Sequence, residues 1–230
     1  WLAWLAWLAW LAWLAWLAWL AWHGFVGGMV RISGGTLCGR RLTTPEGLRV
    51  RPTGERVRQA MLNMVQGQLS GCRVLDLFAG SGLLGIEALS RGAATAVFVE
   101  KEPDLVQLIR GNLERSGLGE RGQVIRASVF APEAYGGGSG SVDVSRFDLV
   151  FMDPPYGEGL AAAALQKVVW SRLLQPDAVV IVEHAAEIDV LPECCGLHMW
   201  KQRRYGGTGV TLFQWTPSST LTTTLVERQQ

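Results

Sequence analysis

The stretch FDLVFMDPPYGEG, residues 147–159, has the residue types and spacing most suggestive of chemistry. An apolar run ends there in Asp153, Pro154, Pro155 and Tyr156. Proline has no N–H and a fixed φ, and it holds the residue before it extended, so two prolines in succession make a stiff bend. The bend combines a carboxylate with backbone carbonyls and has no backbone donor at either proline. Such a group of acceptors matches a planar amino group on an aromatic ring, which has two protons to donate.

The same four residues suggest how an aryl amine could become reactive. If Asp153 and the carbonyl of Pro154 accept the two amino protons, the nitrogen can pyramidalise and its lone pair becomes available. Tyr156 offers a face for stacking a base, worth about 1–3 kcal/mol, and a paired base would have to be flipped out first. We therefore predict group transfer to the amino group of a base. A plain strand cap with Tyr156 in the core is the alternative.

A glycine-rich stretch, DLFAGSGLLG at 76–85, predicts a cofactor site. It has the spacing G-x-G-x-x-G, beginning at Gly80, between a predicted strand and a predicted helix. Glu100 follows twenty residues after Gly80, where an acid can accept the hydroxyl protons of a ribose. Asp76 would repel a pyrophosphate but suits a cofactor with a cationic end. S-adenosylmethionine fits this description; a capping role for Asp76 on the following helix is the alternative.

Strands and helices alternate around these motifs from residue 73 to 184. We predict strands at 73–80, 94–100, 123–128, 147–152 and 178–184, and helices at 54–65, 81–92, 105–117 and 160–174. This alternation predicts an α/β fold with a parallel sheet and helices on both faces. Ligands bind such sheets beyond the carboxyl ends of the strands, so we expect the chemistry after Leu77, Val99 and Met152.

Less regular segments flank this core. Residues 29–53 alternate short apolar pieces with Gly, Thr and Pro, which predicts a small hairpin or irregular arm. Two β-like runs at 196–206 and 209–215 predict an antiparallel hairpin at the sheet edge. The Gly-Ser segment at 135–141 is typical of a surface insertion.

Composition divides the chain into four parts. Residues 1–28 begin with a Trp-Leu-Ala repeat that holds eight of the eleven tryptophans. A three-residue period would spread Trp around every face of a helix, and no basic region precedes the repeat as in a secretory signal. We interpret it as a translated nucleotide repeat ahead of a start at Met29, with a membrane anchor as the alternative. The other parts are a basic arm with the start of the first helix (29–58), an α/β domain (59–216) and a polar tail (217–230).

Charge is uneven along the chain, although the net charge is only +1. Between Met29 and Arg58 there are seven arginines and two glutamates, a local charge of +5 that suits contact with phosphates. A solvated arm is the alternative. The four cysteines and three histidines show no metal-ligand spacing, so we expect no metal site and a reduced, cytoplasmic protein.

Taken together, these motifs resemble a known family. FMDPPY resembles the amino-methyltransferase signature of class I S-adenosylmethionine-dependent enzymes. From about Met29 to Trp215 the chain resembles the bacterial 16S rRNA guanine-N2 methyltransferases called RsmD, on the segments RPTGERVRQAMLN, VLDLFAGSGLLGIEALSRGA, VFVEK and KQRRYGGTGVTLF. The resemblance implies a Rossmann-like, mostly parallel seven-stranded sheet with an antiparallel C-terminal hairpin. It also implies S-adenosylmethionine as cofactor, 16S rRNA or the assembling small ribosomal subunit as partner, no membrane partner, and a monomer.

The resemblance also assigns roles to individual residues. Asp76, Gly80 and Gly82 would hold the methionine part of the cofactor, Glu100 the ribose, and Ser128 would lie by the adenine. Asp153 to Tyr156 would hold the guanine. The full set expected at the cofactor is Asp76, Phe78, Ala79, Gly80, Ser81, Gly82, Glu100, Lys101 and Ser128, and the set expected on RNA phosphates is Arg49, Arg51, Arg56 and Arg58.

Three other functions remain open from the sequence. Methylation of adenine N6 in DNA, or of a protein amide, would keep the mechanism and change the acceptor. An NAD-dependent oxidoreductase is suggested by the glycine loop and Glu100, but Asp76 and the Pro-Pro bend disfavour it. A non-catalytic RNA-binding module is disfavoured by the intact Asp153 and Gly80.

Overall fold

The computed structural model describes residues 28–45, 52–136, 146–155, 159–187 and 196–217. A two-stranded hairpin precedes an α/β unit, and the elements are β1 (Met29–Arg31), β2 (Arg41–Thr43), α2 (Pro52–Met64), η1 (Gln66–Gln68), β3 (Arg73–Leu77), α3 (Leu83–Ser90), β4 (Thr95–Glu100), α4 (Pro103–Arg115), β5 (Gly122–Arg126), η2 (Pro132–Tyr135), β6 (Phe147–Met152), α5 (Leu160–Trp170), β7 (Leu174–Ala185), β8 (Leu197–Tyr205) and β9 (Thr208–Trp215).

The main sheet has seven strands in the order β5-β4-β3-β6-β7-β9-β8. The five strands from β5 to β7 in this order run parallel, while β9 is antiparallel to both β7 and β8. The predicted Rossmann-like fold with an antiparallel C-terminal hairpin is confirmed. Chain order reverses at β3, between β4 and β6, so the carboxyl ends of these three strands meet at the switch point where such folds bind ligands.

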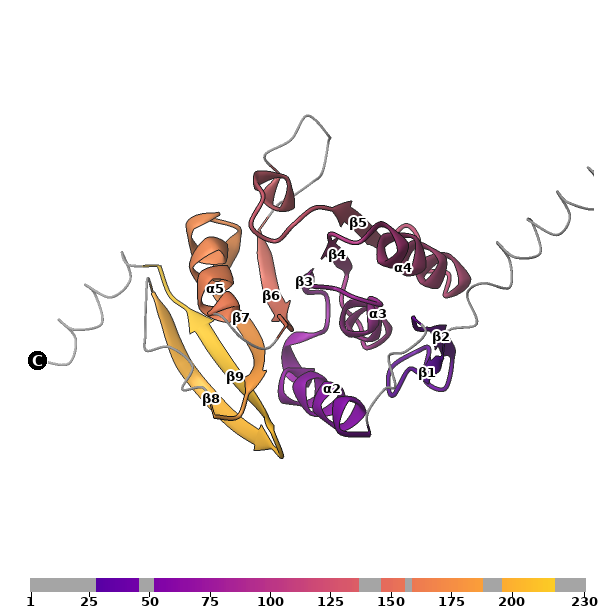
Figure 1. The fold of residues 1–230 in the computed structure, drawn as a ribbon, viewed down its shortest axis with the longest axis horizontal. Coiled ribbons are helices and arrows are strands. Elements are labelled where there is room, and N and C mark those ends of the chain that lie inside the picture. The colour runs from indigo at the N-terminus through magenta and orange to yellow at the C-terminus, as the bar shows by residue number, and fades with distance from the viewer. Residues whose placement is uncertain (1–27, 46–51, 137–145, 156–158, 188–195, 218–230) are drawn as a thin grey trace, which may run out of the picture.

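Helices cover both faces of the sheet, with α2, α3 and α4 on one side and α5 and η2 on the other (Figure 1). Each side has its own apolar core. Phe98 and Phe151 belong to the core beneath α2, α3 and α4, and Val99 and Met152 belong to the core beneath α5. Because central strands are buried on both faces, they read as continuous apolar runs. Asp148 interrupts the run in β6, where its carboxylate accepts the backbone N–H of Arg73 at 2.8 Å.

The N-terminal hairpin is packed onto the α/β unit. Strands β1 and β2 pair antiparallel, which confirms the predicted hairpin. Ile32 and Leu42 from this segment are buried in the same core as Val57 and Met61 of α2. The basic segment and the α/β unit therefore share one core across the boundary predicted at residues 58 and 59.

Several predicted element ends were wrong, with the largest errors in β3, α5 and β7. Strand β3 ends at Leu77 rather than 80. Helix α5 ends at Trp170 rather than 174, because Arg172 takes a left-handed conformation with φ of 59°. Strand β7 begins at Leu174 rather than 178, since it continues through an irregularity in its pairing with β6 at which Asp177 has a φ of 64°. Neither positive φ has a sequence signal, because both residues lack the freedom of glycine.

The described part of the chain has no helix long and apolar enough to cross a membrane. The Trp-Leu-Ala repeat, most of the Gly-Ser segment at 135–141 and the tail from 218 onward lie outside the described residues.

Candidate active site

Three carboxylates meet at the switch point of the sheet. In the paired register Asp76 of β3 lies between Phe98 of β4 and Phe151 of β6. Glu100 is two residues beyond Phe98, and Asp153 is two residues beyond Phe151, so side-chain alternation predicts the same face for all three. The charges of Asp153 and Glu100 both raise the pKa of Asp76, which shows that the three carboxylates interact. The structure thus brings together the acids that the sequence predicted.

Asp76 is almost completely buried, with 2% of its surface exposed. Burial raises the pKa of its carboxyl to about 8, and the charges of Asp153 and Glu100 add to the shift. One carboxyl oxygen accepts the N–H of Gly85, in the first turn of α3, at 2.9 Å, so the capping role is also present. No described residue donates to the other oxygen. An ammonium group bound there would stabilise the ionised form that burial disfavours.

Gly85 explains how α3 approaches Asp76 so closely. A Cβ at this position would lie 2.3 Å from the ring of Phe98 and 3.1 Å from a carboxyl oxygen of Asp76. Any larger residue would push the helix away from β3 and β4. The third glycine of the motif is therefore needed for helix–sheet packing.

The loop between β3 and α3 is held in an unusual conformation. Phe78, Gly80 and Gly82 have positive φ values of 59°, 56° and 76°. The conformation of Phe78 costs of order 1–3 kcal/mol, the kind of strain found at functional sites. A Cβ on Gly80 would meet no atom closer than 3.9 Å, so the loop backbone is open to close approach by a ligand.

Glu100 holds the glycine loop in place, in addition to the contact with a cofactor ribose that the sequence predicted. Its carboxylate accepts the N–H of Gly80 at 2.8 Å on one oxygen, and those of Lys101 and Glu102 at 2.8 and 3.0 Å on the other. Only 7% of the residue is exposed. Because each carboxylate oxygen has two lone-pair sites, the oxygen facing Gly80 can still accept a hydroxyl proton. The sequence indicated the ribose contact but not the loop contact.

Asp153 is in contact with solvent, but protein atoms surround much of its carboxyl group. Its surface is exposed, yet desolvation by the surrounding protein raises the pKa of the carboxyl to about 7, and the charge of Glu183 raises it further. Pro154 is buried and Pro155 exposed. No described residue donates a hydrogen bond to the carboxylate of Asp153 or the carbonyl of Pro154. Tyr156 lies outside the described residues.

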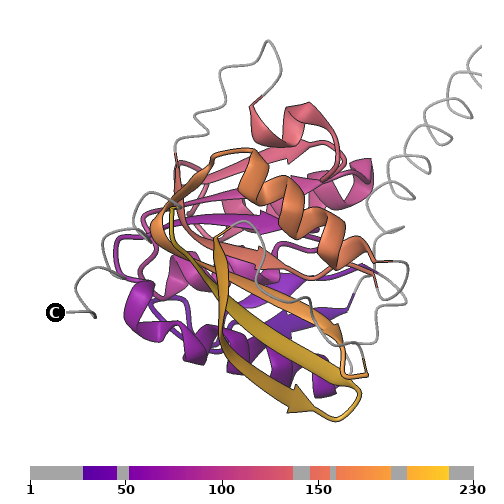
Figure 2. The same ribbon diagram turned by 90° about the vertical axis from the view of Figure 1, so that its left-hand side faces the viewer.

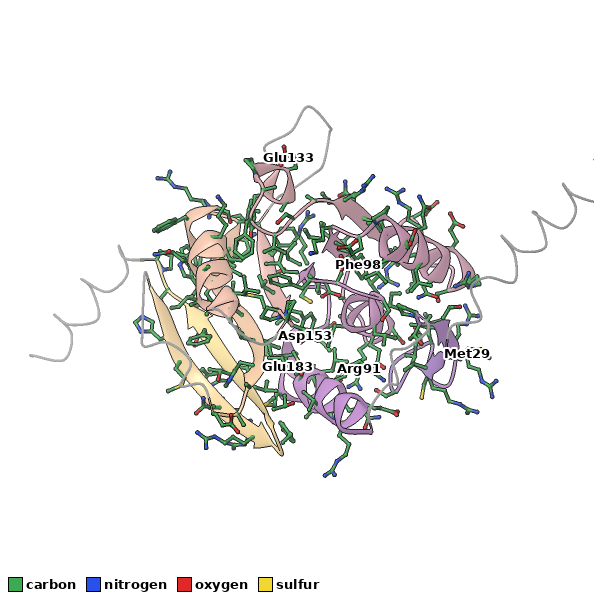
Figure 3. All side chains as sticks on the ribbon, viewed as in Figure 1. Met29, Arg91, Phe98, Glu133, Asp153 and Glu183 are labelled. Carbon is green, nitrogen blue, oxygen red and sulfur yellow. The ribbon has the colours of Figure 1, made fainter. Side chains whose placement is uncertain are left out.

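Glu183 was not predicted from the sequence to be a site residue. It directly follows Val182 of β7, which pairs with Met152 of β6. Asp153 and Glu183 each follow one member of this pair, so they lie level with each other on neighbouring parallel strands. Figure 3 shows them close together beside α2. An acid at the end of an apolar run was visible in VVIVEH, but only the register shows that it faces Asp153.

The other residues expected at the cofactor line the same edge. Ala79 donates its N–H to the carbonyl of Val99 at 3.1 Å, which joins the loop to β4. Lys101 is exposed, and Ser128 is exposed just after β5. Phe130 was not predicted; it is 39% exposed, and its ring centroid lies 6.4 Å from that of Phe78.

Asn112 was also missed. It is fully buried in α4, where its side-chain amide donates to the carbonyls of Thr43 at 3.0 Å and Ser81 at 3.3 Å. Its side-chain oxygen accepts the N–H of Thr43 at 3.1 Å. Asn112 therefore ties the N-terminal hairpin to the glycine loop. A polar residue inside the apolar stripe of this helix was the available signal.

The predicted RNA-binding arginines divide into three groups. Arg49 and Arg51 lie outside the described residues, and Arg56 is exposed on α2. Arg58 is only 6% exposed and pairs with the fully buried Glu87 of α3 at 3.2 Å. The expectation for Arg58 does not fit this position, because a guanidinium that neutralises a buried carboxylate is not available to a phosphate.

Comparison with known proteins places the chain in a family. The family model described as "Conserved hypothetical protein 95" matches residues 30–214. The chain belongs to this family. Among its relatives, "Putative rRNA methyltransferase YlbH" of Bacillus subtilis is 36% identical over 186 residues, covering 80% of this chain and 98% of the relative. "Ribosomal RNA small subunit methyltransferase D" of Escherichia coli K12 is 31% identical over 189 residues, covering 81% and 90%.

Solved structures of proteins similar in sequence to this chain have the same fold. "Putative methyltransferase yhhF" from Escherichia coli aligns with a TM-score of 0.70 at 29% identity, over 83% of this chain and all of the other. A hypothetical protein of Thermus thermophilus, TTHA0928, aligns with a TM-score of 0.63 at 35% identity, over 80% and 98%. The fold is that of the S-adenosylmethionine-dependent methyltransferases. Among the described residues, no group of three or more His, Cys, Asp or Glu is arranged to hold a metal ion.

Proposed function

We propose that the chain transfers the methyl group of S-adenosylmethionine to the exocyclic N2 of a guanine in 16S rRNA. Its membership of the RsmD-like family makes it an S-adenosylmethionine-dependent rRNA methyltransferase. The choice of guanine N2 and of the small subunit goes further. The choice of guanine N2 is carried by one observation: Asp153, next to Pro154, lies level with Glu183 of the neighbouring strand and beside Asp76. The small subunit is supported by the name of the Escherichia coli relative.

The residues present fit the cofactor. Buried Asp76 offers an oxygen to an ammonium group, Glu100 offers one to a ribose hydroxyl, and the backbone at Gly80 is open. Bound S-adenosylmethionine supplies an electrophilic methyl group on a cationic sulfur. Because the N-terminus of α3 is already capped by Asp76, this end of the sheet favours a cationic ligand over a pyrophosphate.

Asp153 and Pro154 prepare the acceptor nitrogen. Two hydrogen bonds, one to the Asp153 carboxylate and one to the Pro154 carbonyl, hold the amino group in place and stabilise the positive charge that develops on the nitrogen as it attacks the methyl carbon. As the nitrogen forms its new bond it must lose a proton. A carboxylate with a pKa of about 7 can accept that proton near neutral pH.

Glu183 favours guanine over adenine. Guanine presents N1–H and the N2 amino group side by side, so both can donate to neighbouring carboxylates, Asp153 and Glu183. Adenine presents an unprotonated N1 beside its amino group, and that acceptor would face a carboxylate without a proton between them. Methylation of adenine N6 is therefore the weaker proposal.

Replacement of Asp153 by Ala tests the assigned role. We expect Asp153→Ala to lower the rate of methyl transfer to 16S rRNA at least about a hundredfold, as when one preorganised transition-state contact is removed. S-adenosylmethionine affinity by calorimetry should stay within about twofold. The matched control is Glu120→Ala, an exposed acid before β5 at the opposite end of the sheet. An Asp153→Ala enzyme as fast as the parent would refute the role.

A further inference from the structure

The segment KQRRY, residues 201–205, is strongly basic and has no role in the site described above. It belongs to β8, the strand at the edge of the sheet. The β8–β9 hairpin carries Lys201, Arg203 and Arg204, and residues 196–217 contain no Asp or Glu. Figure 2 shows this hairpin in gold along one side of the molecule. It is a second basic surface, separate in the chain from the arginines of residues 31–58.

The strand register places this basic surface at the active-site end of the sheet. Glu183 of β7 pairs with Val210 of β9, and Val210 pairs with Arg203 of β8. Paired residues lie on the same face of a sheet, so Arg203 lies on the face of Glu183. At about 4.8 Å per strand, Arg203 lies about 10 Å from Glu183 and about 14 Å from the row of Asp153.

Arg204 lies one row further toward the turn. It pairs with Gly209, which pairs with His184, and its charge helps to lower the pKa of His184, after the larger effect of burial. The two arginines therefore point to opposite faces of the hairpin near its turn. The turn itself, at Gly206 and Gly207, lies beyond the carboxyl end of β7.

Both guanidinium groups are available. Arg203 and Arg204 are exposed, and the side chain of Arg203 donates only to the carbonyl of Gln202, at 2.9 Å, among the described residues. No described carboxylate forms an ion pair with either. Arg58 is different, because Glu87 neutralises it inside the protein. Two unpaired cations at the active-site end of a strand without acids are electrostatically complementary to a phosphate backbone.

We infer that the β8–β9 hairpin is an RNA-binding surface, on which Arg203 and Arg204 contact phosphates that flank the target nucleotide. This inference rests on the proposed function, since it needs an RNA substrate whose base reaches Asp153. The contacts position the RNA and do not read its sequence. Trp200, half exposed on the same strand, offers a face on which an unpaired base can stack.

The salt dependence of RNA binding tests the inference. The full chain and the double variant Arg203→Ala/Arg204→Ala are titrated with an unmodified 16S rRNA transcript over a range of salt concentrations. Each lost phosphate contact should reduce the slope of log K against log salt by roughly one unit. S-adenosylmethionine affinity should not change. Arg203→Lys/Arg204→Lys, which keeps both charges, should retain the slope.

Arg172→Ala is the matched control, because Arg172 is exposed at the opposite end of the sheet, just before β7. Its slope should equal that of the parent. A double Ala variant with an unchanged slope, or an equal loss in Arg172→Ala, would overturn the inference while the parent still binds and methylates RNA. A parent chain that binds S-adenosylmethionine but neither binds nor methylates RNA would instead reject the proposed function, and the inference with it.

Discussion

Asp153 and Asp76 are carboxyl groups whose pKa values lie far above the ordinary range, at about 7 and about 8. In both cases desolvation is the main cause and neighbouring acids add to it. A carboxylate that must accept an amino proton, or bind an ammonium, works only when ionised. We therefore expect both methyl transfer and cofactor binding to depend on pH in the neutral range.

Methyl transfer should rise with pH through about 7. Below that value Asp153 is protonated and cannot accept the amino proton, whereas above it the carboxylate is available. Rates measured from pH 5.5 to 8.5 at saturating S-adenosylmethionine would show this acid limb. Asp153→Asn, which keeps an oxygen acceptor but does not titrate, should flatten it. An acid limb that persists in Asp153→Asn would contradict the assignment of the titration to Asp153.

Asp76 should control cofactor affinity. Asp76→Asn keeps an acceptor for the N–H of Gly85 but loses the charge, so S-adenosylmethionine should bind roughly ten- to a hundredfold more weakly. In the parent chain, affinity should increase with pH through about 8, because the bound cation needs the ionised acid. Calorimetry on both proteins checks this. Equal S-adenosylmethionine affinities for the parent chain and Asp76→Asn would show that Asp76 does not bind the cofactor.

Asp76 should also affect stability without cofactor. The unfolded carboxyl ionises near 4, whereas the folded one keeps its proton up to about 8, so the folded state binds more protons between these values. The stabilisation is fully present below 4 and is lost as pH rises through 8. Urea unfolding of the cofactor-free chain should show the effect, and Asp76→Asn should lack it.

Sequence patterns located the central residues but not all their contacts. Asp76, Gly80, Glu100 and Asp153 lie at or just beyond the carboxyl ends of their strands. A parallel sheet brings these ends together, so their meeting was predictable. The pairing of Asp153 with Glu183 was not, because it depends on the register of β7 with β6.

At the scale of elements, helix α2 shows where pattern reading fails. Residues 54–65 were predicted to form this helix and Arg58 was expected on RNA phosphates, yet Arg58 points inward. Glu87 of α3 is fully buried and also accepts from the backbone N–H and hydroxyl of Ser33, at 2.9 and 2.8 Å. A buried carboxylate needs a cation. The helix therefore turns Arg58 toward α3, a requirement set by another element.

Arg56 and Arg58 form a matched pair of variants on this helix. Arg58→Ala leaves the buried carboxylate of Glu87 with only the more distant guanidinium of Arg91, at 3.9 Å, among the described cations. It should lower the free energy of unfolding by about 3 kcal/mol. Arg56→Ala, at an exposed position, should change it by less than about 0.5 kcal/mol. Urea unfolding measures both. Equal and small effects would show that the ion pair with Glu87 is not needed for stability.

At the scale of the whole molecule, the N-terminal hairpin is part of the catalytic unit. Ser33 reaches Glu87 of α3, and Thr43 reaches Asn112 of α4, which in turn contacts the glycine loop at Ser81. The fold class and the C-terminal hairpin were predictable from alternation and turn residues, whereas the strand order was not predicted. This docking was not, because it depends on single polar side chains inside apolar faces.

Removal of residues 1–27 should leave a folded, active chain. Gly28 must stay, because its carbonyl accepts the N–H and hydroxyl of Thr44 at 2.8 and 2.9 Å. The truncated chain should match the parent in thermal unfolding temperature and in methyl transfer. Loss of folding or activity would show that the Trp-Leu-Ala segment contributes to the protein. Further removal of Gly28 should cost stability, which provides an internal comparison.

The identity of the methylated nucleoside is the decisive test of the proposed function. The full chain is incubated with methyl-labelled S-adenosylmethionine and unmodified small ribosomal subunits or 16S rRNA, and the RNA is digested and analysed by mass spectrometry. We expect one labelled product, N2-methylguanosine, in 16S rRNA from the parent chain and its near absence with Asp153→Ala. Label in N6-methyladenosine, or no transfer to RNA by a chain that binds the cofactor, would contradict it.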